Sequence, residues 1–373
     1  MRGGAPGTGP IVRPASPAAG ESVRVLAWPA HANRGQNPYT SSLYRELERL
    51  GATIADFTPR RALTGKYDVL HVHWVDTVLA ARPAVLARAK AHVFLGLVRL
   101  MQRRGTTVVW TIHNLASHDQ AVSDRFARAW WRRFVESVDV HISLSQVGRA
   151  QAEEAFARLR DVPGFVVPHA HYRDEYANIV GGDAARSELG VADDARVLLF
   201  FGMIRPYKNA VALVRTFRAV DDDLGVLLVA GQPFPPTLAR ELAAAAGGDE
   251  RVRLDLESIA AERVQLYFNA ADLVVLPYTR VLNSGAALLA LSFDRPLLLP
   301  DTPVFRELQA SVGESWVRTY DGDLTSADLV AALAWAREVP RRERAPLDAY
   351  EPRLLAEATF AAYRAGPPSP AAG

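Results

Sequence analysis

Two short stretches in the second half of the chain combine residue types that can hold a diphosphate. In residues 201–209, Gly202 follows an apolar run, and two cations, Arg205 and Lys208, come before a helical pattern. Glycine permits a sharp turn, and the amides at a helix start attract anions together with nearby cations. Lys208 carries the most weight, because only three of the 43 basic residues are lysine. The pattern predicts a phosphate-binding turn, although an ordinary strand-to-helix turn with solvated charges has the same residues.

A second turn of this kind spans residues 283–285. It follows the apolar run 273–276 and the loop that contains Tyr278, and it precedes an apolar helical pattern. The Ser284 hydroxyl and free backbone amides can bind a phosphate oxygen, whereas Ser284 alone is typical of a helix N-cap. Two such turns in one unit predict a site for a phosphate-bearing ligand, whose contacts would be Gly202, Arg205, Lys208, Tyr278, Asn283, Ser284 and Gly285.

Strand-like apolar runs alternate with helical patterns along the chain, which predicts an α/β fold of two Rossmann-like, doubly wound domains facing across a cleft. The expected strands are 23–28, 69–72, 107–112, 140–144 and 165–167, then 197–201, 226–229, 273–276, 296–299 and 316–319. The expected divisions are a disordered tail 1–20, an N-terminal domain 21–180, a C-terminal domain 181–349, a helix at about 350–365 that returns to the first domain, and a disordered tail 366–373.

The composition separates the two halves. The 373 residues include no cysteine, which excludes disulfides, thiolate metal sites and cysteine nucleophiles. The net charge of +2 conceals 23 basic against 15 acidic residues up to position 180, and 20 against 26 after it. All nine histidines lie in the first half. We therefore expect the two domains to bind chemically different partners.

Short blocks along residues 23–320 make the chain resemble the GT-B fold glycosyltransferases, and within them the inverting GDP-mannose-dependent β-mannosyltransferases of xanthan-type polysaccharide assembly. The resemblance implies a nucleotide-sugar donor in the second domain and a lipid-linked glycan acceptor in the first. Asn37, Tyr39, His73, Trp74, His171 and Tyr172 would then contact the acceptor. The matching blocks are 37–39 with 43–44, 67–74, 113–115, 118–119, 171–174, 204–208, 277–278, and 283–285 with 288–291.

One departure from related enzymes bears on stereochemistry. Retaining GT-B enzymes carry two glutamates eight positions apart around the equivalent of Gly285, where this chain has Leu282 and Ala290. Neither side chain can accept a hydrogen bond from ribose or face the reacting sugar. The resemblance therefore favours an inverting transfer that uses a separate catalytic base.

The base of an inverting transfer takes the proton of the acceptor hydroxyl, and histidine-rich loops of the first domain are its expected source. Asp119 is the predicted base, and His118 and His113 are its rivals, because a His/Asp neighbourhood can tune a base near neutral pH. His71 and His73 are expected to point to opposite faces of their strand, so that one is a core residue. Asn37 is expected to cap a helix whose first residue is Pro38.

No metal and no cofactor are expected. The histidines lack metal-ligand spacing such as HExxH. Asp321-Gly322-Asp323 matches the DxD signature of metal-dependent glycosyltransferases, but it is also an ordinary turn after the strand at 316–319. GT-B enzymes generally neutralise the diphosphate with cations and helix ends, which favours the turn.

Two basic segments predict contact with an anionic membrane surface. Residues 84–104 and 126–134 combine apolar residues, including Trp130 and Trp131, with many arginines. Ordinary helices packed on a sheet would look the same, and no nucleic-acid module fits. The chain shows no signal peptide and no apolar run long enough to span a bilayer. We expect a cytoplasmic protein, peripheral on the inner face of the plasma membrane.

Two other functions fit the same residues. One is a GT-B transferase that uses a UDP-sugar, since no residue above selects the base of the nucleotide. The other is a GT-B scaffold that binds a sugar nucleotide or glycan without turnover. Arg205, Lys208 and the loop carboxylates argue against the scaffold.

Overall fold

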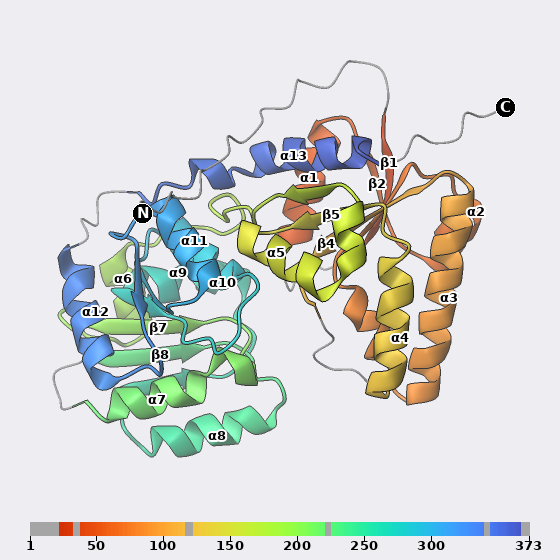
Figure 1. Ribbon diagram of the computed structural model, residues 1–373. Helices are drawn as coiled ribbons and strands as arrows, with labels where there is room; N and C mark the ends of the chain where they lie inside the picture. Colours follow the sequence, from red (N-terminus) through yellow and green to blue (C-terminus); the bar gives the residue numbers. More distant parts are fainter. Residues whose placement is uncertain (1–21, 33–37, 116–121, 221–224, 339–343, 367–373) are drawn as a thin grey trace, which may run out of the picture.

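The computed structural model contains two parallel six-stranded sheets, each flanked by helices (Figure 1). It describes residues 22–32, 38–115, 122–220, 225–338 and 344–366. The first sheet has the strand order β2-β1-β3-β4-β5-β6, and the second has β12-β11-β10-β7-β8-β9. All pairings are parallel, and the sequence prediction of two doubly wound units is confirmed.

The first sheet buries apolar side chains on both of its faces. Helices α2 to α5 cover one face, and α1 and α13 cover the other (Figure 1). The elements are β1 Arg24–Trp28, α1 Tyr39–Arg49, β2 Thr53–Asp56, α2 Pro59–Thr64, β3 Val69–Val72, the 3-10 helix η1 Val75–Leu79, α3 Ala84–Arg103, β4 Thr107–Ile112, α4 Asp124–Val135, β5 Val140–Ser143, α5 Gln146–Ala155, η2 Ala157–Asp161 and β6 Gly164–Val166.

The second sheet has the strand order of a dinucleotide-binding domain. Its order reverses between β7 and β10, the point where ligands bind in open α/β sheets. The elements are α6 Gly182–Glu188, β7 Val197–Phe201, η3 Pro206–Lys208, α7 Ala210–Arg218, β8 Val226–Ala230, α8 Thr237–Ala246, β9 Val252–Asp255, α9 Ala261–Ala270, β10 Leu273–Val275, α10 Gly285–Ser292, β11 Leu297–Pro300, α11 Pro303–Val312, β12 Val317–Tyr320, α12 Ser326–Glu338 and η5 Asp348–Tyr350.

The last helix, α13 Pro352–Arg364, returns to the first sheet (Figure 1). It packs against α1, β4 and β5. Near its end, the Tyr363 hydroxyl lies 2.8 Å from Nδ1 of His71 on β3, so the end of the chain contributes to the polar core of the first domain.

Two local predictions need correction. Helix α1 begins at Tyr39, with Pro38 rather than Asn37 at the N-cap, and Asn37 lies outside the described residues. Trp130 and Trp131 on α4 are 2% and 6% exposed and belong to the core, where the Trp130 indole donates to the Ala91 carbonyl. The aromatic pair that we assigned to a membrane surface therefore stabilises the packing of α4 on α3 and the sheet.

Candidate active site

The turn after β7 is built on two closely packed glycines. Gly202 has a φ of +107°, and Gly231, with a φ of +139°, lies so close that a methyl group there would meet the Gly202 carbonyl oxygen at 2.2 Å. Only glycine tolerates this combination of dihedral and contact. This close packing fixes the path of the backbone after β7 at the carboxyl edge of the sheet.

Lys208, at the end of η3, points its ammonium group back to this turn. Its Nζ would lie 3.8 Å from a methyl at Gly202 and lies 5.5 Å from the centre of the Tyr278 ring. Burial, together with the neighbouring guanidinium of Arg205, lowers the pKa of Lys208 to about 8. Arg205 itself stacks 4.2 Å from the centre of the exposed Phe234 ring. A partly desolvated ammonium of this kind gains stability when an anion binds beside it.

The second predicted turn forms the N-terminus of α10. The Ser284 hydroxyl accepts a hydrogen bond from the Ala287 amide at 3.2 Å, so Ser284 is the N-cap that its residue type suggested. Tyr278 is buried beside Ser284, and its hydroxyl makes no hydrogen bond of good geometry within the described residues. Both turns flank the point where the strand order reverses, since one follows β7 and the other follows β10.

The start of α10 abuts residues that precede the second domain. A methyl group at Gly285 would lie 3.1 Å from the Tyr172 hydroxyl and 3.5 Å from Nε2 of His169. The Tyr172 amide donates to the Ser292 hydroxyl at 2.8 Å. Glycine at 285 therefore allows the segment between the domains to approach the helix N-terminus closely.

The two domains also meet at the loop after β4. The Asn283 side-chain amide donates to the carbonyl oxygen of His113 at 3.0 Å. Beside this contact lies a cleft of about 620 Å³ whose walls come from both domains, including Asn114 and Gln151 from the first and Tyr207, Arg280 and Asn283 from the second. The carboxyl edges of both sheets thus open onto one shared space.

An aromatic cluster lines the first-domain side of this junction. Tyr39, the first residue of α1, is its centre, with ring centroids 4.2 Å from His169, 5.2 Å from His113 and 5.7 Å from His73. Trp74 stacks on His113 at 4.5 Å. The structure therefore brings four of the predicted residues, Tyr39, His73, Trp74 and His113, into one cluster.

A chain of hydrogen-bonding atoms runs from this cluster into the core. Nε2 of His113 lies 3.2 Å from Nδ1 of His73, whose Nε2 lies 2.7 Å from the Tyr44 hydroxyl. The same hydroxyl lies 2.9 Å from Nδ1 of His71, and Nε2 of His71 lies 2.7 Å from the Thr111 hydroxyl. His71 and His73 therefore point to the same face, and our expectation of opposite faces is wrong because alternate residues of a strand share a face.

Burial keeps these histidines neutral. It lowers the pKa of His71 to about 3 and that of His169 to about 4. It also lowers the pKa of His73 and of His113 well below the usual range, and the neighbouring histidines add to the effect. At neutral pH the rings are therefore uncharged and take part in the hydrogen-bonded chain as neutral donors and acceptors.

The remaining predicted residues are placed differently. Asp119 and His118, the proposed base and its neighbour, lie outside the described residues, as does Asn37. His171 is buried against the segment that leads into α13, because its amide donates to the Tyr350 carbonyl and its Nε2 lies 3.0 Å from a Glu351 carboxylate oxygen. An acceptor role for His171 stays a prediction.

Sequence reasoning missed three residues of the site. Tyr44 joins His71 to His73, but its place is visible only once α1 packs on β3. Arg280 lines the cleft in a loop already noted for Tyr278. Asp76, on η1 after β3, has a carboxylate oxygen 3.5 Å from the Asn114 side-chain amide, which places it beside the His113 loop. Its position in the loop that follows the buried strand β3 was the available signal.

Metal-binding arrangements do not occur in the part of the chain that the structure describes, where no three histidine, aspartate or glutamate side chains gather in that way. Asp321 and Asp323 are exposed in a turn that follows β12, with Gly322 at a φ of +69°. The turn that we predicted is present at the edge of the second sheet, away from the reversal between β7 and β10.

Known proteins resemble the chain in sequence and in fold. Two proteins named GDP-mannose:glycolipid 4-beta-D-mannosyltransferase, from Xanthomonas campestris pv. campestris, are 32% and 31% identical over 326 residues, which cover 87% of this chain and 87% of each relative. The chain matches no model of a known protein family. Sucrose-phosphate synthase from Thermosynechococcus elongatus has a similar structure, with a TM-score of 0.61 at 15% identity over 92% of this chain and 94% of that one. The lipopolysaccharide glycosyltransferase WaaG has a TM-score of 0.61 at 13% identity over 92% and 99%. The fold is thus GT-B, as the sequence predicted.

Proposed function

This chain belongs to the family of the GDP-mannose:glycolipid 4-beta-D-mannosyltransferases, and we propose that it transfers mannose from GDP-mannose to a lipid-linked glycan with inversion. One observation carries the proposal. The phosphate-type turn at Ser284 and Gly285 abuts the His169 and Tyr172 side chains, beside a cleft shared by both domains. A donor held at that turn would present its sugar to the histidine cluster.

The second domain binds the donor diphosphate. Lys208 and Arg205 supply cations, and the amides at the start of α10 supply hydrogen-bond donors and the positive end of a helix. The same groups stabilise the negative charge that builds on the diphosphate as the bond to the anomeric carbon breaks. No divalent ion is needed for this neutralisation.

Inversion follows from a direct displacement at the anomeric carbon. The acceptor hydroxyl oxygen forms a bond to that carbon, GDP leaves from the opposite face, and the hydroxyl proton passes to a base of the first domain. An α-linked donor then gives a β-mannoside. Leu282 and Ala290 support this route, because Leu282 lines the cleft without a carboxylate and Ala290 is fully buried in α10.

Asp119 is the proposed base, with His118 and His113 as alternatives. His113 is neutral and so has a nitrogen that can accept a proton. Its lowered pKa makes it a weak base, however, and this favours the Asp119 carboxylate as the base. Asp119→Asn should reduce kcat by roughly 10²- to 10⁴-fold and leave donor binding unchanged. Asp76→Asn is the matched comparison beside the same loop, and a loss confined to that variant would reassign the base.

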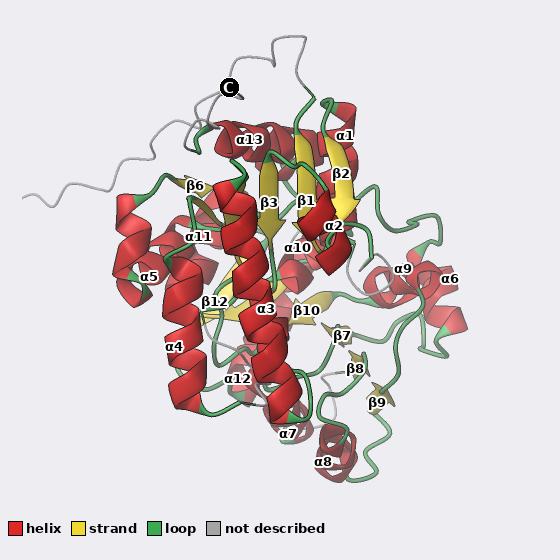
Figure 2. Ribbon diagram, turned by 90° about the vertical axis from the view of Figure 1, so that its right-hand side faces the viewer, coloured by secondary structure: helices red, strands yellow, loops and turns green. Residues whose placement is uncertain are grey.

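The first domain docks on an anionic membrane through α2, α3 and α4, which lie next to one another in Figure 2. These three helices contain ten basic residues and one acidic residue, Asp124. On α3, exposed apolar residues accompany the charges, namely Val85, Leu86 and Val93. Among the described residues, the structure has no helix with the length and apolar character of a membrane span. Binding to anionic but not to neutral liposomes at low salt would support this docking, and indifference to both would refute it.

The donor assignment is tested by comparing GDP-mannose with UDP-glucose and UDP-glucuronate. Thermal shift and turnover are measured for each, with a lipid-linked oligosaccharide as acceptor. We expect stabilisation and transfer with GDP-mannose alone. Preferential stabilisation by a UDP-sugar would replace the mannose assignment, and binding without turnover by any donor would indicate a scaffold.

A further inference from the structure

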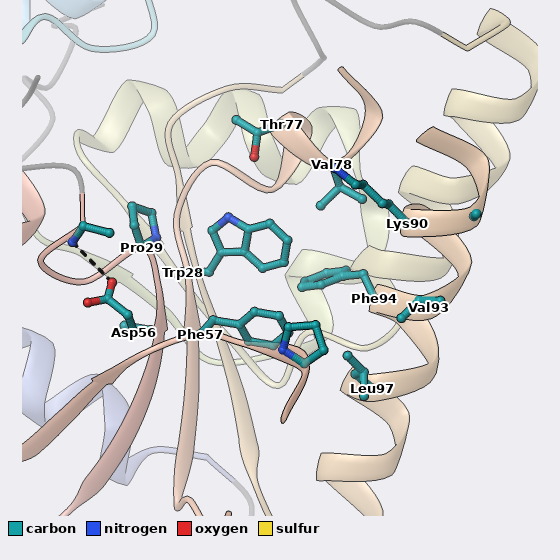
Figure 3. Close-up of a pocket in the computed structure, with 14 residues that line it drawn as sticks. Trp28, Pro29, Asp56, Phe57, Thr77, Val78, Lys90, Val93, Phe94 and Leu97 are labelled. Atoms are coloured by element: carbon teal, nitrogen blue, oxygen red, sulfur yellow. Dashed lines mark hydrogen bonds between the residues drawn. The ribbon is translucent and has the colours of Figure 1, made fainter. Parts of the chain in front are cut away.

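The first domain contains a second ligand-sized space that the donor and its reacting sugar do not use. A pocket of about 570 Å³ opens between α3 and the ends of β1 and β2 (Figure 3). Three aromatic side chains form its wall. The centre of the Trp28 ring lies 4.8 Å from that of Phe57, which is stacked on it, and 4.8 Å from that of Phe94, which meets it edge-on. Its volume lies within the range of small-molecule sites.

Apart from Lys90 at its mouth, the polar side chains that line this pocket already make hydrogen bonds. The Asp56 carboxylate accepts hydrogen bonds from the Ala30 amide at 2.8 Å and from the Ala32 amide at 3.3 Å. The Thr77 hydroxyl donates to the Trp74 carbonyl at 2.7 Å. A sugar ring would leave buried hydroxyls without partners there, at a cost in free energy. The lining therefore suits a hydrocarbon ligand.

The pocket occupies the point where the strand order of the first sheet reverses. Trp28 ends β1, and Val78 belongs to η1, which follows β3, so the pocket lies across the β1 and β3 ends. Ligands of open α/β sheets bind in this crevice. His73 follows β3 directly, and His113 follows β4, the next strand along the same edge. The pocket lies on the α3 face of the sheet and the histidine cluster on the α1 face, and the strand ends connect them, since the His73 amide donates to the Trp28 carbonyl oxygen at 2.9 Å.

The mouth of the pocket combines apolar side chains with positive charge. Lys90 and Val93 of α3 line it and are exposed (Figure 3). Residues 84–103 contain no acidic residue, and Arg88 and Arg99 are exposed on the same helix. An anionic headgroup attached to a hydrocarbon chain matches both properties at once.

We propose that this pocket holds a hydrocarbon segment of the acceptor's lipid, with Lys90 beside the lipid's anionic headgroup. The inference rests on the proposed function, because the acceptor must be lipid-linked for the pocket to serve it. Seating the chain here anchors the acceptor at the edge of the sheet that also carries His73 and His113. The exposed Val93 beside the mouth lets the chain enter from the membrane surface.

The test is a binding measurement that needs no turnover. Farnesyl diphosphate, farnesol and inorganic diphosphate are titrated into the full-length protein, with excess GDP present to occupy the donor turns. Ala89→Trp fills the pocket from the exposed side of α3, and Val85→Trp adds the same ring outside the lining. We expect farnesyl diphosphate to bind wild type and Val85→Trp, and to bind Ala89→Trp about tenfold or more weakly, since each buried methylene contributes.

The other probes distinguish the contribution of the hydrocarbon chain of the ligand from that of its negative charge. Farnesol should bind wild type and lose affinity in Ala89→Trp, whereas Lys90→Glu should weaken farnesyl diphosphate and leave farnesol unchanged. Equal binding to Ala89→Trp and Val85→Trp, binding of inorganic diphosphate as tight as that of farnesyl diphosphate, or no binding of either prenyl compound to wild type would overturn the proposal. If the donor were not GDP-mannose, GDP could leave the donor turns open to both diphosphate probes, but farnesol binding and its loss in Ala89→Trp would be unaffected, so the two failures are distinguishable.

Discussion

Replacing Lys208 by methionine removes the cation that faces the Gly202 turn while keeping most of the side-chain stem. Its Nζ lies 5.5 Å from the centre of the Tyr278 ring, within the half-buried end of the donor site. A hydrogen bond between charged groups contributes about 1.5–3 kcal/mol, so Lys208→Met should weaken GDP-mannose binding by roughly 10- to 150-fold. Isothermal titration with GDP-mannose in the absence of acceptor measures this directly.

The pH dependence of the same titration tests the physical cause. Burial and Arg205 lower the pKa of Lys208 to about 8 in the free protein, and a bound diphosphate raises it again. Affinity should therefore be constant below pH 8 and fall as the pH rises above it, by about tenfold between pH 7 and pH 9. GDP-mannose has no terminal phosphate that titrates in this range, and any contribution from deprotonation of its guanine ring would persist in Lys208→Met.

The matched control is Lys66→Met, which removes an exposed lysine of the first domain. Lys66→Met should bind GDP-mannose like wild type and keep the fall in affinity above pH 8, whereas Lys208→Met should lose that fall. Unchanged affinity in Lys208→Met, or the same pH profile in both variants, would refute the phosphate role of Lys208. Thermal unfolding of both variants checks that the fold is intact.

Three further changes probe the turns and the buried histidines. Ser284→Ala removes the N-cap of α10, so urea unfolding should show a loss of stability of about 1 kcal/mol. Titration should show a weaker affinity for GDP-mannose. Unchanged stability in this variant would contradict the capping role of Ser284. Gly231→Ala places a methyl group 2.2 Å from the Gly202 carbonyl oxygen and should lower the free energy of unfolding by about 2 kcal/mol or more. Gly248→Ala is the control, because a methyl there has nothing within 4 Å and causes only backbone strain. Equal losses of stability in the two variants would argue against the clash. The pKa of His71 falls from an unfolded value of 6.5 to about 3 on folding, so its stabilisation is complete above pH 6.5 and is lost as the pH falls toward 3, by about 2 kcal/mol at pH 5. The other buried histidines of the cluster, whose pKa values are also lowered, add losses of the same sign, so unfolding free energies equal at pH 7.5 and pH 5 would contradict the burial of neutral histidines.

The two turns of the second domain were predictable because their signals are local. The fully buried strands β7 and β10 end directly before Gly202 and the Tyr278 loop, so strand, turn and helix follow one another in the sequence. Strands β2 and β9 were missed for the opposite reason. Both are edge strands whose residues are only partly buried, and their short sequences, TIAD and VRLD, lack a continuous apolar run.

The aromatic and histidine cluster of the first domain depends on contacts between segments that are distant in the chain. Tyr39 reaches His169 across 130 positions, and Tyr363 reaches His71 from the last helix. No spacing pattern in the sequence predicts contacts between residues so far apart in the chain. Charge patterning did indicate the basic residues of α3, but it misplaced the aromatic pair of α4. The spacing of the apolar residues on α4 was the better signal, because they recur at i, i+3, i+4, i+7 and i+8 and so form one buried face, made by Ala127, Trp130, Trp131, Phe134 and Val135.

The anomeric configuration of the product tests the proposed reaction most directly. Purified protein is incubated with α-linked GDP-mannose and a lipid-linked oligosaccharide, and the new linkage is assigned by NMR and by digestion with anomer-specific mannosidases. A displacement across the cleft, with GDP held at the α10 turn and a base on the opposite side, predicts a β-mannoside. An α-mannoside would contradict it, since that product requires retention.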